Sequence, residues 1–236
     1  MSDIFNYEHP FVCTDAVVFT MNTEMSDSYR KLPEVQLKIL LYKREAEPFI
    51  NKWCLPGGFL NIDEMPEDNI RRKLLEKSNV EKCFLEQLCT FSDIKRDPRA
   101  RVISLSYIGL MNEAESMKFD SSAKWFVVQQ KNGQISLRSD DVAISESDLG
   151  FDHFTIIKVA LERLKSKIQY SDIIFNLLPQ EFTLTELQNV FEVIQDKKES
   201  VANFRRKTMR MVSETENYSG EKGHRPAKLF IRRETL

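Results

Sequence analysis

The sequence predicts an α+β protein in which a strand-rich domain, residues 1–150, precedes a helical domain, residues 151–236. Apolar residues come in short alternating or β-branched runs through the first part, as expected for strands. After Gly150 the apolar spacing changes to three and four residues, which is the period of helices. Charge divides the chain in a similar way, because its last 40 residues are basic and the rest is acidic. The predicted strands are 11–20, 35–44, 101–110 and 124–128.

One helix is predicted within the strand-rich domain, over residues 66–77. Pro66 suits the first helical position, and Glu67 and Asp68 follow in the first turn, where acidic side chains face the positive end of the helix dipole. The polar stretch 129–148 predicts a loop or an irregular excursion.

Three helices and a hairpin are predicted in the second domain. The second helix begins at a capping box, Thr183 with Glu186 three residues on. The third is expected over 200–212, and a basic turn bounded by glycines precedes the β-like run 228–231, which suits a hairpin. The apolar stripe of the first helix consists of Ile157, Leu161, Leu164 and Ile168.

The charge distribution indicates a polyanionic partner for the C-terminal end. Residues 197–236 contain 11 basic and five acidic residues, a net charge of +6, which leaves −8 for residues 1–196. The first ten residues contain acids and no basic segment followed by a long apolar run. We therefore expect no signal peptide, no membrane partner and a cytoplasmic location.

The cysteines and histidines predict no metal site. No pair of cysteines has CxxC spacing or a nearby histidine, so reduced thiols are expected. The histidines lie far apart in the sequence and form no ligand cluster. The residues concerned are Cys13, Cys54, Cys83 and Cys89, with His9, His153 and His224.

The segment WCLPGGF is followed by a helix whose charged residues have a specific spacing. Gly58, Glu64 and Arg72 are separated by five and seven residues, and Leu74 and Glu76 follow. The pattern resembles the Nudix box, which runs Gly, five residues, Glu, seven residues, then Arg-Glu-Ile/Leu-any-Glu-Glu-any-Gly. The resemblance implies a Nudix α/β/α sandwich with a mixed sheet, in which Glu64 and Arg72 hold the loop against the helix.

The helix departs from the Nudix box where the family binds Mg²⁺. Three carboxylates at i, i+3 and i+4 would share one helical face, but this chain has Lys73, Glu76 and Lys77 there. An ammonium group offers no oxygen ligand and repels the cation, so we expect a pocket that binds without hydrolysing and requires no cofactor. Glu64, Arg72 and Glu76 are then remnants of a catalytic set. The two lysines would either contact phosphate or point to solvent.

A second resemblance concerns residues 87–107, which are similar to a segment of Nudix proteins that handle ADP-ribose. There Arg96 and Arg99 would flank an Asp-Pro turn beside the ligand and contact its diphosphate. The alternative is an ordinary Asp-Pro turn with surface arginines. The predicted ligand-binding residues are Arg44, Gly57, Gly58, Lys73, Lys77, Arg96 and Arg99.

The C-terminal helices and the basic hairpin predict a winged helix-turn-helix domain. In such a domain the last helix enters the major groove, and the wing contacts the backbone or the minor groove. Arginine suits guanine edges and phosphate, asparagine suits adenine, and lysine suits phosphate. The alternative is a helical dimerisation module with solvated charges. The predicted DNA-binding residues are Asn203, Arg205, Arg206, Lys207, Arg210, Lys222, Arg225 and Lys228.

The two halves together resemble the NrtR-type Nudix-related transcriptional regulators. The segments that carry the likeness include 151–167, NFRRK at 203–207 and RPAKLF at 225–230. The resemblance implies a homodimeric repressor that binds double-stranded DNA at an inverted repeat. It also implies an effector, which would be ADP-ribose or a related nucleotide or sugar metabolite.

An enzyme is the alternative function. A Mg²⁺-dependent Nudix hydrolase acting as an ADP-ribose pyrophosphatase would need metal ligands other than the usual three. Glu64 and Glu76, with Glu67 or Asp97, are the acids that could supply them.

Overall fold

The structure is a computed structural model that describes residues 7–24, 34–112, 122–131, 133–139, 142–220 and 226–233. Its strands are β1 (Phe11–Glu24), β2 (Glu34–Lys43), β3 (Trp53–Cys54), β4 (Gly57–Phe59), β5 (Phe84–Phe91), β6 (Val102–Leu110), β7 (Ala123–Lys131), β8 (Gln134–Ser139), β9 (Val142–Ile144), β10 (Val212–Tyr218) and β11 (Lys228–Arg232). Its helices are α1 (Pro66–Ser78), α2 (His153–Lys167), α3 (Leu184–Gln195) and α4 (Val201–Thr208), with the 3-10 helices η3 (Glu146–Asp148) and η4 (Ile173–Leu177). None of the helices in these ranges has the length and apolar character needed to cross a membrane.

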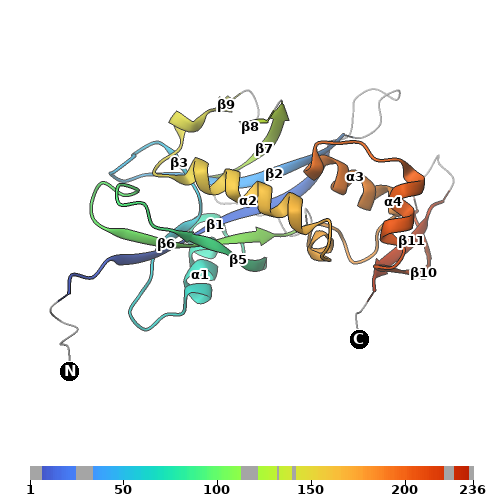
Figure 1. Cartoon of the computed structure of the whole chain (residues 1–236), viewed down its shortest axis with the longest axis horizontal. Helices are drawn as coiled ribbons and strands as arrows, with labels where there is room; N and C mark the ends of the chain where they lie inside the picture. The colour runs from blue at the N-terminus through green and yellow to red at the C-terminus, as the bar shows by residue number, and fades with distance from the viewer. Residues whose placement is uncertain are drawn as a thin grey trace.

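A mixed sheet occupies the centre of the N-terminal part (Figure 1). Its strand order is β5-β6-β1-β2-β7-β8-β9, with β3 beside β2 and β4 beside β1. The central pair β1 and β6 is parallel, with Phe11 opposite Val102 and Phe19 opposite Leu110. The other strand pairs of this sheet are antiparallel within the described residues. The four strands predicted from the sequence correspond to β1, β2, β6 and β7.

The two faces of the sheet bury two separate layers of apolar side chains. Val17 and Phe19 of β1 join the cluster that contains α2, whereas Ala16 and Val18 join the cluster that contains α1. This alternation follows from the period of two residues in a strand. Figure 1 shows α2 crossing in front of the sheet. The predicted α/β/α sandwich is confirmed, and so is the apolar stripe of the first helix after Gly150.

The C-terminal part consists of η4, α3, α4 and the antiparallel hairpin β10–β11. Thr183 Oγ1 accepts a hydrogen bond from the Glu186 N–H, and the Glu186 carboxylate accepts one from the Thr183 N–H. The predicted capping box is therefore present. Backbone hydrogen bonds exchanged by Phe182 and Phe230 attach the hairpin to the helices. This arrangement confirms the winged helix-turn-helix.

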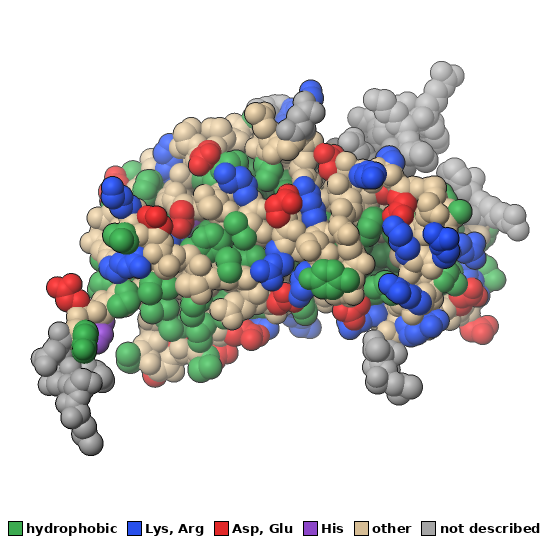
Figure 2. All heavy atoms as spheres, in the orientation of Figure 1, with side chains coloured by type: hydrophobic (Ala, Val, Ile, Leu, Met, Phe, Trp, Pro, Cys, Tyr) green, Lys and Arg blue, Asp and Glu red, His purple; other side chains and the backbone are tan. Residues whose placement is uncertain are grey.

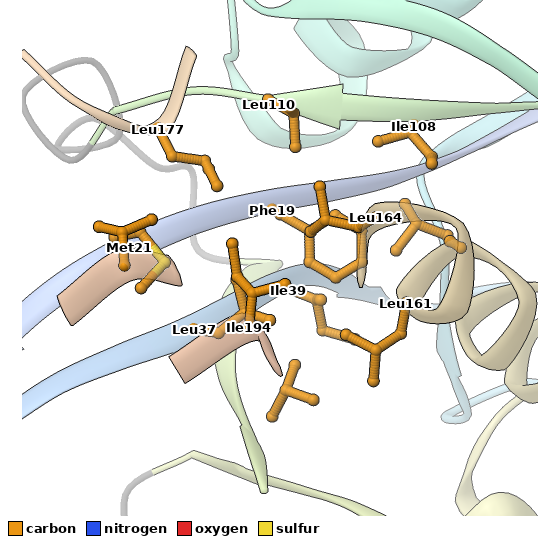
Figure 3. Packing of buried hydrophobic residues seen from close by; sticks show 14 of the residues in the cluster. Phe19, Met21, Leu37, Ile39, Ile108, Leu110, Leu161, Leu164, Leu177 and Ile194 are labelled. Carbon is orange, nitrogen blue, oxygen red and sulfur yellow. The ribbon is translucent and has the colours of Figure 1, made fainter. Parts of the chain in front are cut away.

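One continuous hydrophobic cluster joins the two parts of the chain. Met21 and Leu37, towards the outer ends of β1 and β2, pack in the same cluster as Leu177 of η4 and Ile194 of α3 (Figure 3). Helix α2 lies on the sheet, although the division at residue 150 assigned it to the second domain. The C-terminal part is thus seated directly on the strands of the N-terminal part.

Two segments differ from the prediction. The stretch 129–148 is not a loop, because it contains the end of β7, then β8, β9 and η3. Leu137 is buried while its neighbours are exposed, so the many polar residues on the solvent face concealed a strand near the sheet edge. The third helix, expected over 200–212, ends at Thr208, and the backbone enters β10 at Val212.

Candidate functional site

Hydrogen bonds attach the glycine loop to α1. Thr14 Oγ1 donates to Asn69 Oδ1 at 2.6 Å, and Asn69 Nδ2 donates to the Phe59 carbonyl and to Glu64, both at 2.8 Å. Arg72 reaches the same Glu64 through Nε and Nη2, each 2.7 Å from a carboxylate oxygen. The Arg72 hydrogen bonds lower the pKa of Glu64 to about 2. The expected ion pair therefore holds the loop against the helix.

Lys73 fills the space beside the glycine loop. A Cβ on Gly58 would lie 2.6 Å from Lys73 Cε, so the lysine side chain passes over a backbone that only glycine leaves open. Lys73 Nζ donates to Glu76 Oε2 at 2.7 Å, and its side chain is only 18% exposed. Lys77 Nζ lies 5.3 Å from the centre of the Tyr42 ring, in a cation–π contact. Neither lysine simply points to solvent.

The acids that a metal site would need are all engaged by cations. Mg²⁺ binds oxygen ligands in an octahedral arrangement, and a carboxylate held by an arginine or lysine is a poor donor. In the part of the chain that the structure describes, no three His, Cys, Asp or Glu side chains form a group that could hold a metal ion. The Mg²⁺ of the Nudix family therefore does not fit these residues. The ion pairs are Glu64–Arg72, Glu67–Arg71, Glu76–Arg72, Glu76–Lys73 and Asp97–Arg99.

Two of the predicted ligand-binding arginines lie on the same aromatic ring. The guanidinium carbons of Arg44 and Arg99 are 5.1 and 5.6 Å from the centre of the Phe151 ring, and the Phe49 ring is 4.7 Å from it. Phe49 and Phe151 have φ angles of 67° and 54°, a left-handed conformation that bulky residues rarely adopt. Arg99 is further held by Asp97 at 2.7 Å. We call Arg44, Phe49, Arg99 and Phe151 the aromatic–arginine cluster.

Arg96, the third predicted ligand-binding arginine, lies in the interior. Its side chain is 3% exposed, with Nη2 3.3 Å from Asp15 Oδ2 and 2.8 Å from Asp152 Oδ1. Its Nε donates to Asp152 Oδ2 at 2.9 Å, and Ser104 Oγ donates to Asp15 at 2.6 Å. Arg96 therefore binds one carboxylate on β1 and one at the N-cap of α2. We call Asp15, Arg96 and Asp152 the Arg96 junction.

His153 completes the wall of the Arg96 junction. Its Nδ1 accepts a hydrogen bond from the Leu55 N–H at 3.0 Å, and its Nε2 lies 3.6 Å from Asp15 Oδ1. Burial lowers the pKa of His153 below its ordinary value, although the charge of Asp15 acts in the opposite direction. The imidazole is therefore neutral, with its proton on Nε2 facing Asp15.

Buried groups around the pocket stay protonated. Burial, together with the charge of Asp15, raises the pKa of the Cys13 thiol to about 12. Burial likewise raises the pKa of Cys54 to about 11 and that of Tyr42 to about 12. None of these three groups is activated as a nucleophile, because the thiolate or phenolate form is disfavoured.

Two elements, β1 and α2, run from the Arg96 junction to the C-terminal part. β1 carries Asp15 at the pocket and Met21 against α3 and η4. Asp152 of the Arg96 junction is the N-cap of α2. The 15 residues of this helix span about 22 Å, and its far end lies beside α3. There the Lys165 carbonyl accepts a hydrogen bond from Gln195 Nε2 at 2.6 Å. The Arg96 junction therefore ties together the pocket ends of both elements.

The predicted DNA-binding residues of the third helix are brought together on α4. Phe204 and Thr208 are buried, which turns Arg205 and Arg206 outward on an exposed face. Lys207 is also exposed but donates to Glu199 at 2.5 Å. The flanking positions 203 and 210 are exposed as well. Figure 2 shows Lys and Arg side chains gathering over the part of the surface that α3, α4 and the hairpin form.

The hairpin contributes fewer of the predicted DNA-binding residues to the described structure than α4 does. Lys228 opens β11 and lies with Nζ 4.5 Å from the centre of the Tyr218 ring. Lys222 and Arg225 lie outside the described residues. Arg232, which was not selected from the sequence, forms an ion pair with Asp172.

Several site residues were not selected from the sequence. Asp15 is a carboxylate within the apolar run of β1, and a lone acid in a buried strand is a usable signal. Phe49 and Phe151 carry no comparable signal, because their left-handed backbone cannot be read from residue type. Tyr42 looks like an ordinary strand residue until Lys77 is placed over its ring.

Comparisons with known proteins agree with the two-part fold. Residues 32–141 match the NUDIX domain family, and residues 174–231 match the family described as the NrtR DNA-binding winged helix domain. The chain is 32% identical to the ADPR responsive transcriptional repressor NtrR of Acinetobacter baylyi, over 95% of this chain and 83% of the relative. It is also 32% identical to an ADP-ribose pyrophosphatase of Methanocaldococcus jannaschii, over 43% of this chain and 52% of that protein.

A solved structure shows the same arrangement of the two parts. The NrtR of Shewanella oneidensis, complexed with a 27mer DNA, superposes with a TM-score of 0.72 at 33% identity, covering 94% of this chain and 93% of that one. The fold and the site thus define a Nudix domain with an altered metal-binding helix, joined to a DNA-binding winged helix. The chain belongs to the NrtR family of transcriptional regulators.

Proposed function

We propose that this protein is a cytoplasmic transcriptional repressor that releases DNA when ADP-ribose, or a closely related nucleotide, binds its Nudix pocket. The observation that carries the proposal is that β1 and α2 both start at the pocket and end against the winged helix. A ligand held at one end can therefore favour one placement of the other end. The function of the Acinetobacter baylyi relative, given by its name, supports the same assignment.

The pocket supplies cations and aromatic rings for a nucleotide diphosphate. The planar guanidinium groups of Arg44 and Arg99 suit phosphate oxygens, and the ring of Phe151 lies next to both. Lys73 and Lys77 add positive charge where a Nudix hydrolase would bind Mg²⁺. These two lysines neutralise phosphate in place of the metal, and no cofactor is required.

The sequence predicted that Arg96 contacts the ligand, but we propose a different role for it. Its guanidinium is already satisfied by Asp15 and Asp152 and is almost fully buried. We assign it to coupling, because it joins the pocket ends of β1 and α2 and transmits a shift in one to the other. The response of DNA affinity is then limited to the free energy by which ADP-ribose prefers one arrangement.

The DNA complex is proposed to be symmetric. A homodimer of this chain would present two copies of α4 to an inverted repeat whose half-sites lie about one helical turn, or roughly 34 Å, apart. Arg205 and Arg206 would read bases or phosphates in the major groove, with Asn203 and Arg210 at the flanks. Lys222, Arg225 and Lys228 would contact the backbone from the wing.

Fluorescence anisotropy tests the repressor assignment. The purified full chain is titrated onto duplexes from upstream of its own gene and its neighbours, with and without ADP-ribose, at a stated salt concentration. Tight, sequence-selective binding that ADP-ribose weakens is the expected result. If ADP-ribose leaves DNA binding unchanged, the protein is still a DNA-binding regulator, but ADP-ribose is not its effector.

The same tubes distinguish a sensor from a hydrolase. ADP-ribose is recovered after incubation with Mg²⁺ and separated from AMP by chromatography. We expect intact ADP-ribose and no difference between the wild type and Glu76→Gln. AMP release above background that Glu76→Gln abolishes would instead establish an ADP-ribose pyrophosphatase.

A further inference from the structure

A cavity of about 700 Å³ lies within the C-terminal part, away from the Nudix pocket. It is open to solvent on one side and is lined by the end of α2, by η4, by α3 and α4, and by the turn between the last two helices. The volume falls in the range of small-molecule sites, about 300–1,000 Å³.

The floor of the cavity is apolar and rigid. Ile174, Leu187 and Phe204 line it and belong to the main hydrophobic cluster, with at most 3% of each residue exposed. Phe191 also lines it, half-buried, with its ring centre 5.5 Å from that of Phe204. Phe175 adds a third aromatic ring to the lining. The floor therefore suits an apolar or aromatic body.

The rim of the cavity is cationic. Lys197 and Arg210 line it, and neither side chain has a hydrogen-bond or ion-pair partner within the described residues. Lys198 and Lys207 also line the rim, where Glu192 and Glu199 already bind them. The two unpaired cations leave an excess of positive charge at the mouth of an apolar cavity.

From this juxtaposition we propose a second ligand site, which binds a small organic anion with an aromatic or apolar body. The body fills the space among Phe175, Phe191 and Phe204, and the carboxylate, sulfonate or phosphate group pairs with Lys197 and Arg210. A DNA phosphate would use the rim but would leave the apolar floor empty. The site lies apart from the Nudix pocket and does not depend on the function proposed for it.

A pair of fluorescent probes tests the site on the full chain without DNA. 1-Anilinonaphthalene-8-sulfonate has an aromatic body and one anionic group, and N-phenyl-1-naphthylamine has the same body without the charge. Each is titrated into the wild type, the Lys197→Gln/Arg210→Gln variant and a Lys82→Gln control. Lys82 is an exposed lysine outside the cavity lining, so it matches the loss of a surface cation. The urea unfolding midpoint of each variant is measured alongside.

The charged probe should bind the wild type and Lys82→Gln with one site per chain and equal affinity. Its affinity for Lys197→Gln/Arg210→Gln should fall by about tenfold, as expected for loss of charge-assisted contacts. The neutral probe should bind all three proteins alike. Equal affinity of the charged probe for the double variant and the control would overturn the proposal. Displacement of the charged probe by ADP-ribose would also overturn it, because the probe would then occupy the Nudix pocket.

Discussion

Among single residues, Lys73 marks the clearest departure of this chain from the Nudix box. Its ammonium group occupies a position where the Nudix box has a carboxylate, and it binds Glu76 at 2.7 Å. The remaining acid is therefore neutralised by the residue that replaced its partner. Two ammonium groups, those of Lys73 and Lys77, thus stand where the family has carboxylates, and on this basis we propose that the site attracts phosphate.

This substitution predicts that ADP-ribose binding does not depend on metal. Calorimetric titrations of ADP-ribose, one with excess EDTA and one with excess Mg²⁺, should give the same affinity for ADP-ribose. A metal-dependent Nudix site would lose most of its affinity in EDTA. A large gain in affinity with Mg²⁺ would show that the acids are free to bind metal despite their ion pairs.

Arg96 is predicted to be a large contributor to stability. Arg96→Met leaves Asp15 and Asp152 close together without their shared cation, which should cost about 3–5 kcal/mol of unfolding free energy. Arg101→Met is the matched control from the same loop, because Arg101 binds only exposed carbonyl oxygens, and it should cost less than about 1 kcal/mol. Urea denaturation measures both. Similar losses of unfolding free energy in the two variants would show that the ion pairs of Arg96 do not stabilise the fold as predicted.

His153 is predicted to make stability fall as the pH drops below about 6.5, the ordinary pKa of histidine. Burial lowers its pKa, so the unfolded chain takes up a proton in this range while the folded imidazole stays neutral. Unfolding then binds a proton, and the free energy of unfolding falls by about 1.4 kcal/mol per pH unit. Asp15, Asp152, Arg96 and Arg44 are the charged groups that act on this imidazole.

The comparison with His153→Gln isolates this effect. Other acids with lowered pKa values, such as Glu64 and Glu76, lose their contribution only below about pH 4.5. Urea unfolding of both proteins at several pH values should show a slope in the wild type that the variant lacks. Parallel slopes above pH 5 would contradict a neutral His153.

At the scale of elements, spacing was the reliable guide. The sequence spacing of Gly58, Glu64 and Arg72 predicted the glycine loop and the helix that follows it, α1. The capping box predicted the start of α3. Both signals are local, so residue type and position suffice. β8 was missed because it is an exposed strand whose polar face hides the alternation. Its pairing with β7 is a tertiary contact that no local pattern records.

The exposed face of α4 carries a prediction about DNA. Arg206→Ala should weaken operator binding by about 1–3 kcal/mol and leave ADP-ribose binding unchanged, because α4 lies far from the Nudix pocket along α2. Lys82→Ala, in the N-terminal part, is the control and should bind DNA like the wild type. Anisotropy at fixed salt makes the comparison. Unchanged operator affinity in Arg206→Ala would refute the assignment of α4 as the recognition helix.

In the whole molecule, the two parts are joined by packed elements and one hydrophobic cluster. Met21 on β1 and Ile194 on α3 belong to one cluster, and Gln195 binds the last turn of α2. The sequence predicted both parts but not this connection. Helix α2 read as part of the second domain, since its apolar stripe does not reveal whether a sheet or another helix covers it.

The candidate site was predictable in its class but less so in its geometry. The arginine-rich turn predicted two equivalent ligand-binding arginines, but Arg99 lies on an aromatic ring while Arg96 is buried between two acids. Residue type cannot show which arginine is buried and which lies on a ring. Both environments depend on Phe151 and Asp152, which come from a distant part of the chain. The cavity in the C-terminal part was invisible for the same reason.

If ADP-ribose and DNA binding are coupled, each ligand must change the affinity for the other by the same factor. ADP-ribose is titrated calorimetrically into the full chain alone and into the chain saturated with its operator duplex, in one buffer. We predict that DNA weakens ADP-ribose binding by at least about fivefold, and by the same factor as ADP-ribose weakens DNA binding. Equal affinities for ADP-ribose in the two titrations would contradict the account, because the pocket and the winged helix would then be independent.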